Sequence, residues 1–197
     1  MRLAGFQRCQ LKDADLWFRE EFLPDREASE ILDTLIENTA WTQPVIQLGA
    51  KSIPSPRLAA WFGDEEAFYS YSGVRNVPAP WTPVLQKVRI QLEKVAGSQF
   101  NSVLLNYYRS GQDSMGWHRD NERELGPEPL IGSVSLGESR RFLMQHVKDK
   151  NLRWKIDLRH GSALIMMGQT QNLWRHCLPK SKTRNDPRVN LTFRRIF

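Results

Sequence analysis

Apolar side chains recur at helical spacing in two segments of the first half of the chain. In the first segment, which opens at Pro24, they stand at Ala28, Ile31, Leu32, Leu35 and Ile36. In the second, which starts near Thr82-Pro83 and stops at Gly97, they stand at Leu85, Val88, Leu92 and Val95. Proline is tolerated in a first helical turn, and glycine often ends a helix. The spacing predicts two amphipathic helices that each pack one face on a core.

From Ser102 onward the pattern changes to short apolar runs, most of them closed by Gly, Pro, Asn or Asp. We expect seven strands there, over residues 102–108, 130–136, 141–147, 152–158, 162–167, 173–178 and 188–195. Because no helix separates them, they favour a sandwich or jelly roll over a parallel α/β sheet. Further strands are expected at residues 16–22 and between residues 44 and 81, after a loosely held arm over residues 1–15. The predicted class is α+β, with a β-sandwich core and two helices bracing one sheet.

Composition narrows the class of protein. The chain has 197 residues, 40% apolar and 25% charged, which excludes a wholly disordered or collagen-like chain. The length indicates a single domain, which buries roughly 70% of its unfolded surface. No apolar run approaches the ~20 residues that span a bilayer, and residues 1–10 lack the apolar core of a signal peptide. The two cysteines, Cys9 and Cys177, are too few for a disulfide framework and favour a reducing, cytoplasmic setting (nuclear if eukaryotic). We also expect a monomer without a membrane partner.

The net charge of +6 is unevenly distributed along the chain. Residues 1–100 carry 11 Lys and Arg against 13 Asp and Glu, whereas residues 101–197 carry 17 against 9. A basic half-chain is typical of a protein with an anionic partner such as nucleic acid, and it also occurs in soluble basic proteins without one. Charge alone does not decide between the two.

Candidate metal ligands stand in the segment Trp117-His118-Arg119-Asp120. Residues i and i+2 of an extended segment project to the same side, so His118 and Asp120 can bind one ion together. A third ligand must come from elsewhere, and His176 is the best candidate. Two histidines and one carboxylate with open positions are typical of non-haem Fe(II) oxygenases, and zinc is the nearest competitor. A hydrogen-bonded histidine in a solvated turn is the alternative to any metal site.

The last expected strand alternates polar and apolar side chains. Its polar face holds Arg188, Asn190, Thr192 and Arg194, and its apolar face holds Val189, Leu191 and Phe193. The polar face either lies in water, as in most amphipathic strands, or faces inward to bind a dianionic acid. Guanidinium groups suit the second role because their planar fork makes two parallel charged hydrogen bonds to a carboxylate. The first expected strand alternates likewise, with Asn106 and Tyr108 on one side.

Five segments, in this order and spacing, resemble the AlkB family of Fe(II)- and 2-oxoglutarate-dependent dioxygenases. They are Asn106-Tyr107-Tyr108, residues 118–127, residues 133–137, residues 174–179 and residues 187–194. The resemblance is dense over residues 101–197, extends loosely back through Pro56-Arg57 and residues 69–73, and is weak over residues 1–50. It is closest to the branch of the family that repairs alkylated DNA.

The resemblance implies a fold and a set of site residues. The fold is a double-stranded β-helix, or jelly roll, in which residues 16–100 form helices and substrate-recognition hairpins and residues 101–197 form the catalytic core. The implied Fe(II) ligands are His118, Asp120 and His176. Arg188 would pair with the distal carboxylate of 2-oxoglutarate. The rest of that cosubstrate would be held by Asn106, Tyr108, Asn190 and Arg194.

The implied reaction is an oxidative dealkylation that uses O₂ and 2-oxoglutarate as cosubstrates. Conversion of 2-oxoglutarate to succinate and CO₂ accompanies hydroxylation of an N-alkyl group, whose product releases an aldehyde and the restored base. The implied substrate is alkylated DNA with lesions such as 1-methyladenine and 3-methylcytosine. Two alternatives stay open, which are the same chemistry on RNA and a non-catalytic jelly roll that binds nucleic acid.

The resemblance also implies residues near the substrate base, each with a plain structural alternative. Tyr69 and Tyr71 would flank a flipped base, or they are core aromatics of a short strand. Glu122 would accept a hydrogen bond from an exocyclic amine, or it is a solvated loop carboxylate. Asn121 stands where the duplex-DNA branch usually has a second acidic residue, which bears on the choice of base.

Two further expectations concern the nucleic-acid strand itself. Arg57 and the loop over residues 180–184 would bind phosphates, although surface cations usually have no such role. Leu48, between Gln47 and Gly49, would be an apolar wedge that enters a duplex, or it anchors a short hairpin to the core.

Overall fold

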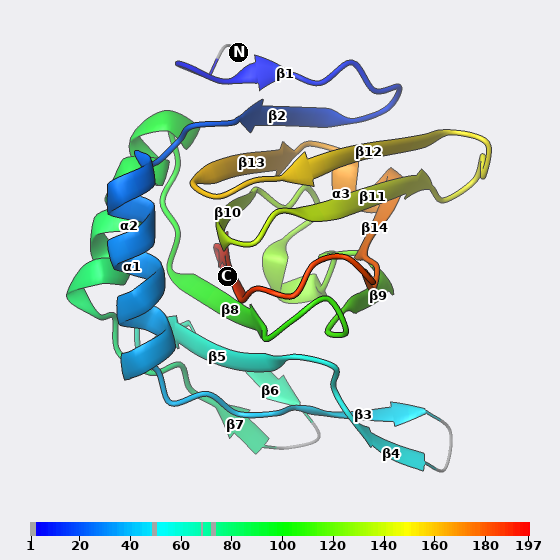
Figure 1. The fold of residues 1–197 in the computed structure, drawn as a ribbon. Helices are drawn as coiled ribbons and strands as arrows, with labels where there is room; N and C mark the ends of the chain where they lie inside the picture. The colour runs from blue at the N-terminus through cyan, green and yellow to red at the C-terminus, as the bar shows by residue number, and fades with distance from the viewer. Residues whose placement is uncertain (1–2, 49–50, 68, 72–73) are drawn as a thin grey trace.

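Two antiparallel β-sheets form the centre of the protein (Figure 1). The computed structural model describes residues 3–48, 51–67, 69–71 and 74–197, without the side chains of residues 46–48, 69–71 and 74–76. Within this part of the chain, the larger sheet has the strand order β1-β2-β13-β10-β15-β8-β5 and the smaller sheet the order β12-β11-β14-β9. Apart from the pairs β1-β2 and β11-β12, neighbours in each sheet are not consecutive in sequence, as in a jelly roll.

The larger sheet consists of β1 (Gln7–Arg8), β2 (Asp15–Arg19), β5 (Leu58–Gly63), β8 (Ser102–Tyr108), β10 (Ile131–Gly137), β13 (Ser162–Met167) and β15 (Arg188–Arg194). The smaller sheet consists of β9 (Met115–His118), β11 (Arg140–His146), β12 (Arg153–Leu158) and β14 (Trp174–Leu178). Two separate hairpins pair β3 (Val45–Leu48) with β4 (Lys51–Pro54) and β6 (Tyr69–Tyr71) with β7 (Val74–Asn76).

One buried cluster joins the two sheets. It combines side chains of the larger sheet with side chains of the smaller one, among them Ile131, Leu164, Met166, Phe142, Met144 and Leu158. Each buried apolar side chain of this size stabilises the fold by roughly 1.5–3 kcal/mol relative to an exposed one. The predicted architecture, mostly β-sheet with few helices, is confirmed at this level.

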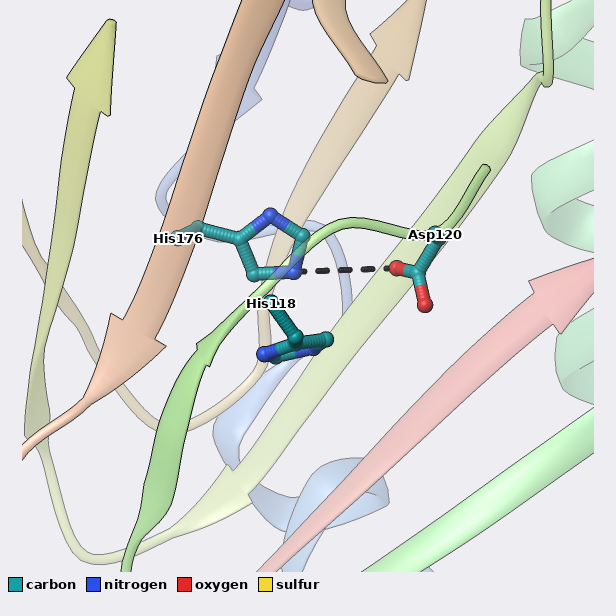
Figure 2. Close-up of side chains that lie close together, drawn as sticks. All are labelled: His118, Asp120 and His176. Atoms are coloured by element: carbon teal, nitrogen blue, oxygen red, sulfur yellow. Dashed lines mark ion pairs between the residues drawn. The ribbon is translucent and has the colours of Figure 1, made fainter. Parts of the chain in front are cut away.

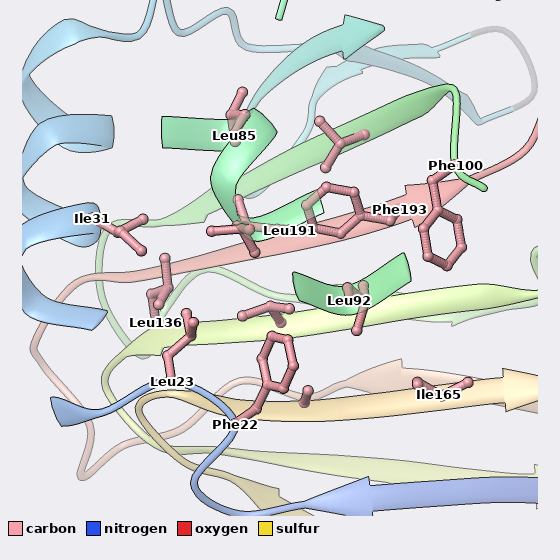
Figure 3. Packing of buried hydrophobic residues seen from close by; sticks show 14 of the residues in the cluster. Phe22, Leu23, Ile31, Leu85, Leu92, Phe100, Leu136, Ile165, Leu191 and Phe193 are labelled. Atoms are coloured by element: carbon pink, nitrogen blue, oxygen red, sulfur yellow. The ribbon is translucent and has the colours of Figure 1, made fainter. Parts of the chain in front are cut away.

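A second cluster lies between the larger sheet and two helices, α1 (Asp25–Asn38) and α2 (Pro83–Ala96) (Figure 3). Its members include Ile31, Leu85, Leu92, Leu136, Leu191 and Phe193. The backbone N–H of Leu85 donates to the Thr82 hydroxyl at the start of α2, and Gly97 ends that helix with a φ of 64°. Both helices predicted from apolar spacing are confirmed. Their apolar faces pack on one face of the larger sheet.

The prediction of a loosely held arm is wrong for residues 3–15, the part of that arm that the structure describes. Leu3 and Phe6 are buried in the helix-side cluster, with the Phe6 ring 6.0 Å from that of Phe22. Strand β1 pairs with β2, which continues the larger sheet by one strand. The apolar residues of this segment are too few to show a period, so only their contacts in the folded chain show that they are ordered.

The predicted run of strands is also wrong in detail. A single helical turn, α3 (Thr170–Leu173), precedes β14, and β9 was not among the expected strands. Elsewhere the boundaries agree within a residue or two, and β8 and β13 agree throughout. No helix in the described part of the chain is long and apolar enough to cross a membrane.

Candidate metal centre and its surroundings

His118, Asp120 and His176 converge between the two sheets (Figure 2). His118 ends β9 and stands opposite His176 in β14, so strand pairing sets the two rings side by side. The chain turns after His118 and brings Asp120 to them. The potential ligand atoms of the three residues lie within 4.8 Å of one another, and Nε2 of His176 is 3.6 Å from a carboxylate oxygen of Asp120.

The donor atoms of this cluster fit a divalent transition metal. Nδ1 of His118 is 2.8 Å from the Gly116 carbonyl, which only accepts, so Nδ1 donates and Nε2 keeps its lone pair. The Asp120 backbone N–H donates to the side-chain oxygen of the buried Gln171 over 3.0 Å, which fixes the turn. Two imidazoles and one carboxylate that leave other positions open are the ligands that Fe(II) oxygenases use.

Burial and neighbouring charges set the protonation states of the cluster. Asp120 is 3% exposed, and burial opposes its ionisation. The charge of Arg194, whose Nη2 donates to Asp120 over 2.5 Å, opposes this effect, and the pKa of the carboxyl is lowered. Burial also lowers the pKa of His176 to about 3. At neutral pH, Asp120 is therefore a carboxylate and His176 a neutral imidazole, which are the forms that bind metal.

Arg188 lies in the same cavity and has no acidic partner in the described part of the chain. It is 2% exposed, and burial lowers its pKa to about 10. Its Nη2 donates to the Ser135 hydroxyl (2.9 Å) and to the Asn190 side-chain oxygen (2.7 Å), whereas its Nε has no partner. Its guanidinium carbon lies 5.2 Å from the ring centroid of Tyr108. A buried cation without a counter-charge is costly, so the position suits an anionic ligand.

The polar face of β15 points inward, so the alternative of a strand face in water is wrong. Asn190 and Thr192 are buried and hydrogen-bonded to each other over 3.0 Å. The cavity has a volume of about 60 Å³, and the polar side chains that line it are Asn106, Tyr108, His118, Asp120, Ser133, His176, Arg188, Asn190, Thr192 and Arg194. All eight residues predicted to hold metal or cosubstrate thus line one cavity.

Arg57, expected to bind phosphate, is half-buried and bonds to two side chains of the fold. Its Nε donates to the side-chain oxygen of Asn106 over 2.7 Å, and its Nη1 donates to the hydroxyl of the buried Ser55 over 2.8 Å. Arg57 therefore orients an amide that lines the cavity. In the loop over residues 180–184, Arg184 pairs with Glu138 at 3.2 Å, while Lys180 and Lys182 are exposed.

A second pocket of about 340 Å³ opens beside Arg194. Glu122 lines it, together with Trp61, Ser102, Leu104, Glu124, Leu125 and Ile196, whereas Asn121 is exposed and lines neither pocket. Trp61 was missed by the sequence analysis, because a tryptophan in an apolar run is indistinguishable from a core aromatic. Only the pairing of β5 with β8, which sets Trp61 opposite Leu104, places it at this pocket.

Three expected substrate residues have described backbones only. Tyr69 and Tyr71 belong to β6, and Leu48 is the last residue of β3, paired with Lys51 beside the turn of its hairpin. Their side chains lie outside the described part of the structure, so their roles stay predictions.

Comparisons with known proteins define the class. The family model described as the 2OG-Fe(II) oxygenase superfamily matches residues 15–194. The chain is 40% identical to the mouse protein named alpha-ketoglutarate-dependent dioxygenase alkB homolog 3. The matched 185 residues cover 89% of this chain and 64% of the relative. It is 40% identical over 184 residues to the human DNA oxidative demethylase ALKBH2, which covers 87% of this chain and 69% of the relative. The chain therefore belongs to the 2OG-Fe(II) oxygenase superfamily and, within it, to the AlkB family.

The chain spans about two thirds of the length of these relatives, 64% of one and 69% of the other. A solved structure titled "The structure of OsALKBH1" matches it with a TM-score of 0.68 at 18% sequence identity, covering 96% of this chain and 100% of the other. This likeness shows a shared fold.

Proposed function

We propose that the protein is an Fe(II)- and 2-oxoglutarate-dependent dioxygenase that removes N-alkyl groups from DNA bases such as 1-methyladenine and 3-methylcytosine. The observation that carries the proposal is a His-Asp-His donor set that shares one cavity with a buried guanidinium, for which the described residues provide no counter-charge. The names of the relatives, a dioxygenase that depends on alpha-ketoglutarate and a DNA oxidative demethylase, support the same activity.

In this proposal His118, Asp120 and His176 hold Fe(II). When bound, the metal with 2-oxoglutarate and O₂ supplies the oxidant for hydroxylation of the alkyl carbon. The chain itself sets the ligands: the Gly116 carbonyl fixes the tautomer of His118, and Arg194 keeps Asp120 ionised.

The cosubstrate would be held by the inward face of β15 and its neighbour β8. Arg188 pairs with the distal carboxylate of 2-oxoglutarate, which supplies the counter-charge that the buried guanidinium lacks. The remaining oxygens of the cosubstrate would bind to four residues that line the same cavity, Asn106, Tyr108, Asn190 and Arg194. Arg57 holds the Asn106 amide in place for this task.

The substrate base would enter the second pocket, between Trp61 and Glu122. A base can reach this depth only after it leaves the helix stack, and an alkyl group on a pairing nitrogen lowers the cost of that step. Hydroxylation of a methyl group gives an N–CH₂OH product. Its C–N bond then breaks, the electron pair and the hydroxyl proton go to the base nitrogen, and formaldehyde leaves.

The rest of the fold would serve as a scaffold. We infer that α1 and α2 brace the larger sheet, because their apolar side chains share a buried cluster with β10 and β15. Residues 16–100 then present the two hairpins to the substrate, and residues 101–197 form the catalytic core of a single domain.

The proposal is tested by incubation with Fe(II), ascorbate and 2-oxoglutarate, followed by mass spectrometry of methylated single- and double-stranded DNA and of methylated RNA. We expect methylated DNA to lose about 14 mass units, which corresponds to one CH₂ group. We expect no loss of mass with His176→Ala. Turnover of methylated RNA alone would show that the substrate is RNA and not DNA. Binding of DNA without turnover of any substrate would leave a non-catalytic jelly roll.

A further inference from the structure

The outer face of the smaller sheet, on the side away from the metal site, carries a group of side chains that the proposed chemistry does not use. Strand pairing sets Leu143 of β11 opposite Lys155 of β12, and Gln145 opposite both Arg153 of β12 and Arg175 of β14. Trp117 of β9 lies next to Arg175 on this face, with the guanidinium carbon 5.0 Å from the centroid of the indole. We call these six residues the outer basic face.

This face combines an exposed aromatic ring with cations that have no acidic partner. Trp117 is 44% exposed, although an indole of this size normally covers apolar surface. No ion pair involves Arg153, Lys155 or Arg175 in the described part of the chain, whereas Arg141, next to the face on β11, is neutralised by Asp157 at 2.7 Å. Trp117, Leu143, Gln145, Arg153 and Lys155 also line one shallow hollow, together with Met144 and Trp154.

The arrangement is held in place rather than left to surface mobility. The side-chain oxygen of the buried Gln145 accepts from Nε and Nη2 of Arg175, at 3.2 and 2.5 Å, which fixes the guanidinium over Trp117. Nε of Arg153 donates to the Lys150 carbonyl at 3.1 Å, which leaves its other nitrogens to point outward. The cation and the ring attract each other, so this part of the surface presents an ordered guanidinium beside an ordered indole.

We propose that the outer basic face binds a single strand of nucleic acid that continues from the target nucleotide, with one base stacked on Trp117 and phosphates held by Arg175, Arg153 and Lys155. Aromatic rings and unpaired cations together are how proteins hold single strands without reading sequence. The proposal rests on the proposed function, since it concerns the strand that carries the alkylated base.

The position of β9 connects the face to the metal site. Trp117 precedes His118 in the strand, so the two side chains point to opposite faces of the sheet and a strand that crosses this edge passes from one to the other. The face spans four strands, about 14 Å at the usual spacing, which exceeds the ~3.4 Å that one stacked nucleotide occupies along a strand. A substrate of a few nucleotides therefore reaches the metal site without reaching the far cations.

The test compares two substrates that share the lesion and differ in length. One is a trinucleotide with a central 1-methyladenine, and the other is a single-stranded 20-mer with the same centre. The variants are Trp117→Ala and the double variant Arg153→Glu with Lys155→Glu. The matched control is Arg26→Glu with Lys94→Glu, which makes the same change in net charge on the exposed surfaces of α1 and α2, across the molecule from the smaller sheet (Figure 1).

We expect the double variant to lower kcat/KM for the 20-mer about tenfold relative to kcat/KM for the trinucleotide, because two phosphate contacts are lost. Trp117→Ala lowers kcat/KM for both substrates, since Trp117 lies next to the metal site and stacking of one base contributes about 1–3 kcal/mol. The double variant also reduces the slope of log affinity against log salt by about 1.4, because two phosphates are no longer neutralised. The control keeps the wild-type ratio. Equal losses on both substrates in the double variant, no loss in Trp117→Ala, or an equal loss in the control would overturn the proposal.

A binding measurement separates this proposal from the proposed function. Fluorescence anisotropy with an unmethylated, labelled 20-mer and the full, Mn(II)-loaded chain requires no turnover. If the face variants bind the 20-mer tenfold more weakly than the wild type, but the wild type demethylates no substrate, the proposed activity is wrong and the outer basic face is still a binding site. Wild-type binding by those variants in an active demethylase would do the reverse.

Discussion

Arg188 is the residue whose environment is least explained by the protein alone. It is among the largest fully buried side chains, it has a nitrogen without a partner, and its neighbours Ser135 and Asn190 are neutral. Keeping a charge under these conditions costs free energy that an anion would return on binding. In the proposed function, the dianion 2-oxoglutarate satisfies this requirement.

Arg188→Ala therefore raises the 2-oxoglutarate concentration needed for half-maximal turnover by about a hundredfold or more, because a charged, bidentate partner is lost. Arg188→Lys restores only part of the affinity, since an ammonium cannot form the same fork. The check is a titration of succinate release, together with the shift in melting temperature on adding 2-oxoglutarate. An unchanged requirement in Arg188→Ala would remove this residue from the cosubstrate site.

The metal cluster gives a second prediction at this scale. Single changes of His118, Asp120 or His176 to alanine abolish turnover, because a three-ligand site has no spare ligand. Circular dichroism serves as the control for folding, and chelation of the wild type followed by added Fe(II) shows that the loss is reversible. Full activity in His176→Ala, or activation by zinc without 2-oxoglutarate, would contradict the assignment.

At the scale of elements, β15 separates two tasks by its alternation. Arg188, Asn190 and Arg194 line the cavity, while Leu191 and Phe193 join the cluster under the helices. A one-residue slip would exchange the two faces, so the pairing of β15 with β8 and β10 specifies both the core and the site.

Phe193→Ala consequently lowers the free energy of unfolding by about 3–5 kcal/mol, since it opens a cavity next to Phe100 and Trp81. Urea denaturation measures the loss, and Phe193→Leu, which keeps most of the volume, serves as the graded control. A loss below 1 kcal/mol would mean that the helix-side cluster does not depend on this ring.

The hairpin of β3 and β4 carries the prediction about duplex substrates. If Leu48 fills the gap left by a flipped base, Leu48→Ala slows repair of duplex DNA several-fold and spares single strands, which have no partner strand to hold open. Parallel time courses on both substrates measure this, with the neighbouring change Gln47→Ala as the control. Equal losses on both would place Leu48 in the hairpin's own packing instead.

Strong periodicity was enough to predict most elements from the sequence, and its absence explains the failures. Helices α1 and α2 and strands β8 and β13 have enough apolar positions to show a period. The four residues of α3 and the two of β1 are too short for one, so their structure depends on tertiary contacts such as those of Thr170 with Asp15. Pattern also missed Trp61, whose place at the second pocket depends on which strand lies beside β5.

At the scale of the whole molecule, the site depends on segments far apart in the sequence. The His118 end of β9, the middle of β14 and the start of β15 meet because the jelly roll places alternate strands in facing sheets. The spacing of His118 and Asp120 was visible in the sequence, whereas the pairing of Arg57 with Asn106 was not, since nothing local marks it. The basic half-chain finds a physical counterpart in the unpaired cations on the outer basic face.

In the proposed function, one cavity couples 2-oxoglutarate decarboxylation to N-dealkylation of DNA. The most direct measurement is the amount of succinate and of formaldehyde released from a 1-methyladenine oligonucleotide in the same reaction, with His118→Ala as the inactive control. Our account predicts about one succinate and one formaldehyde for each base restored, and neither product with the variant. Restored bases without release of succinate would contradict this account. Release of succinate that is independent of the methylated base, without formaldehyde, would also contradict it.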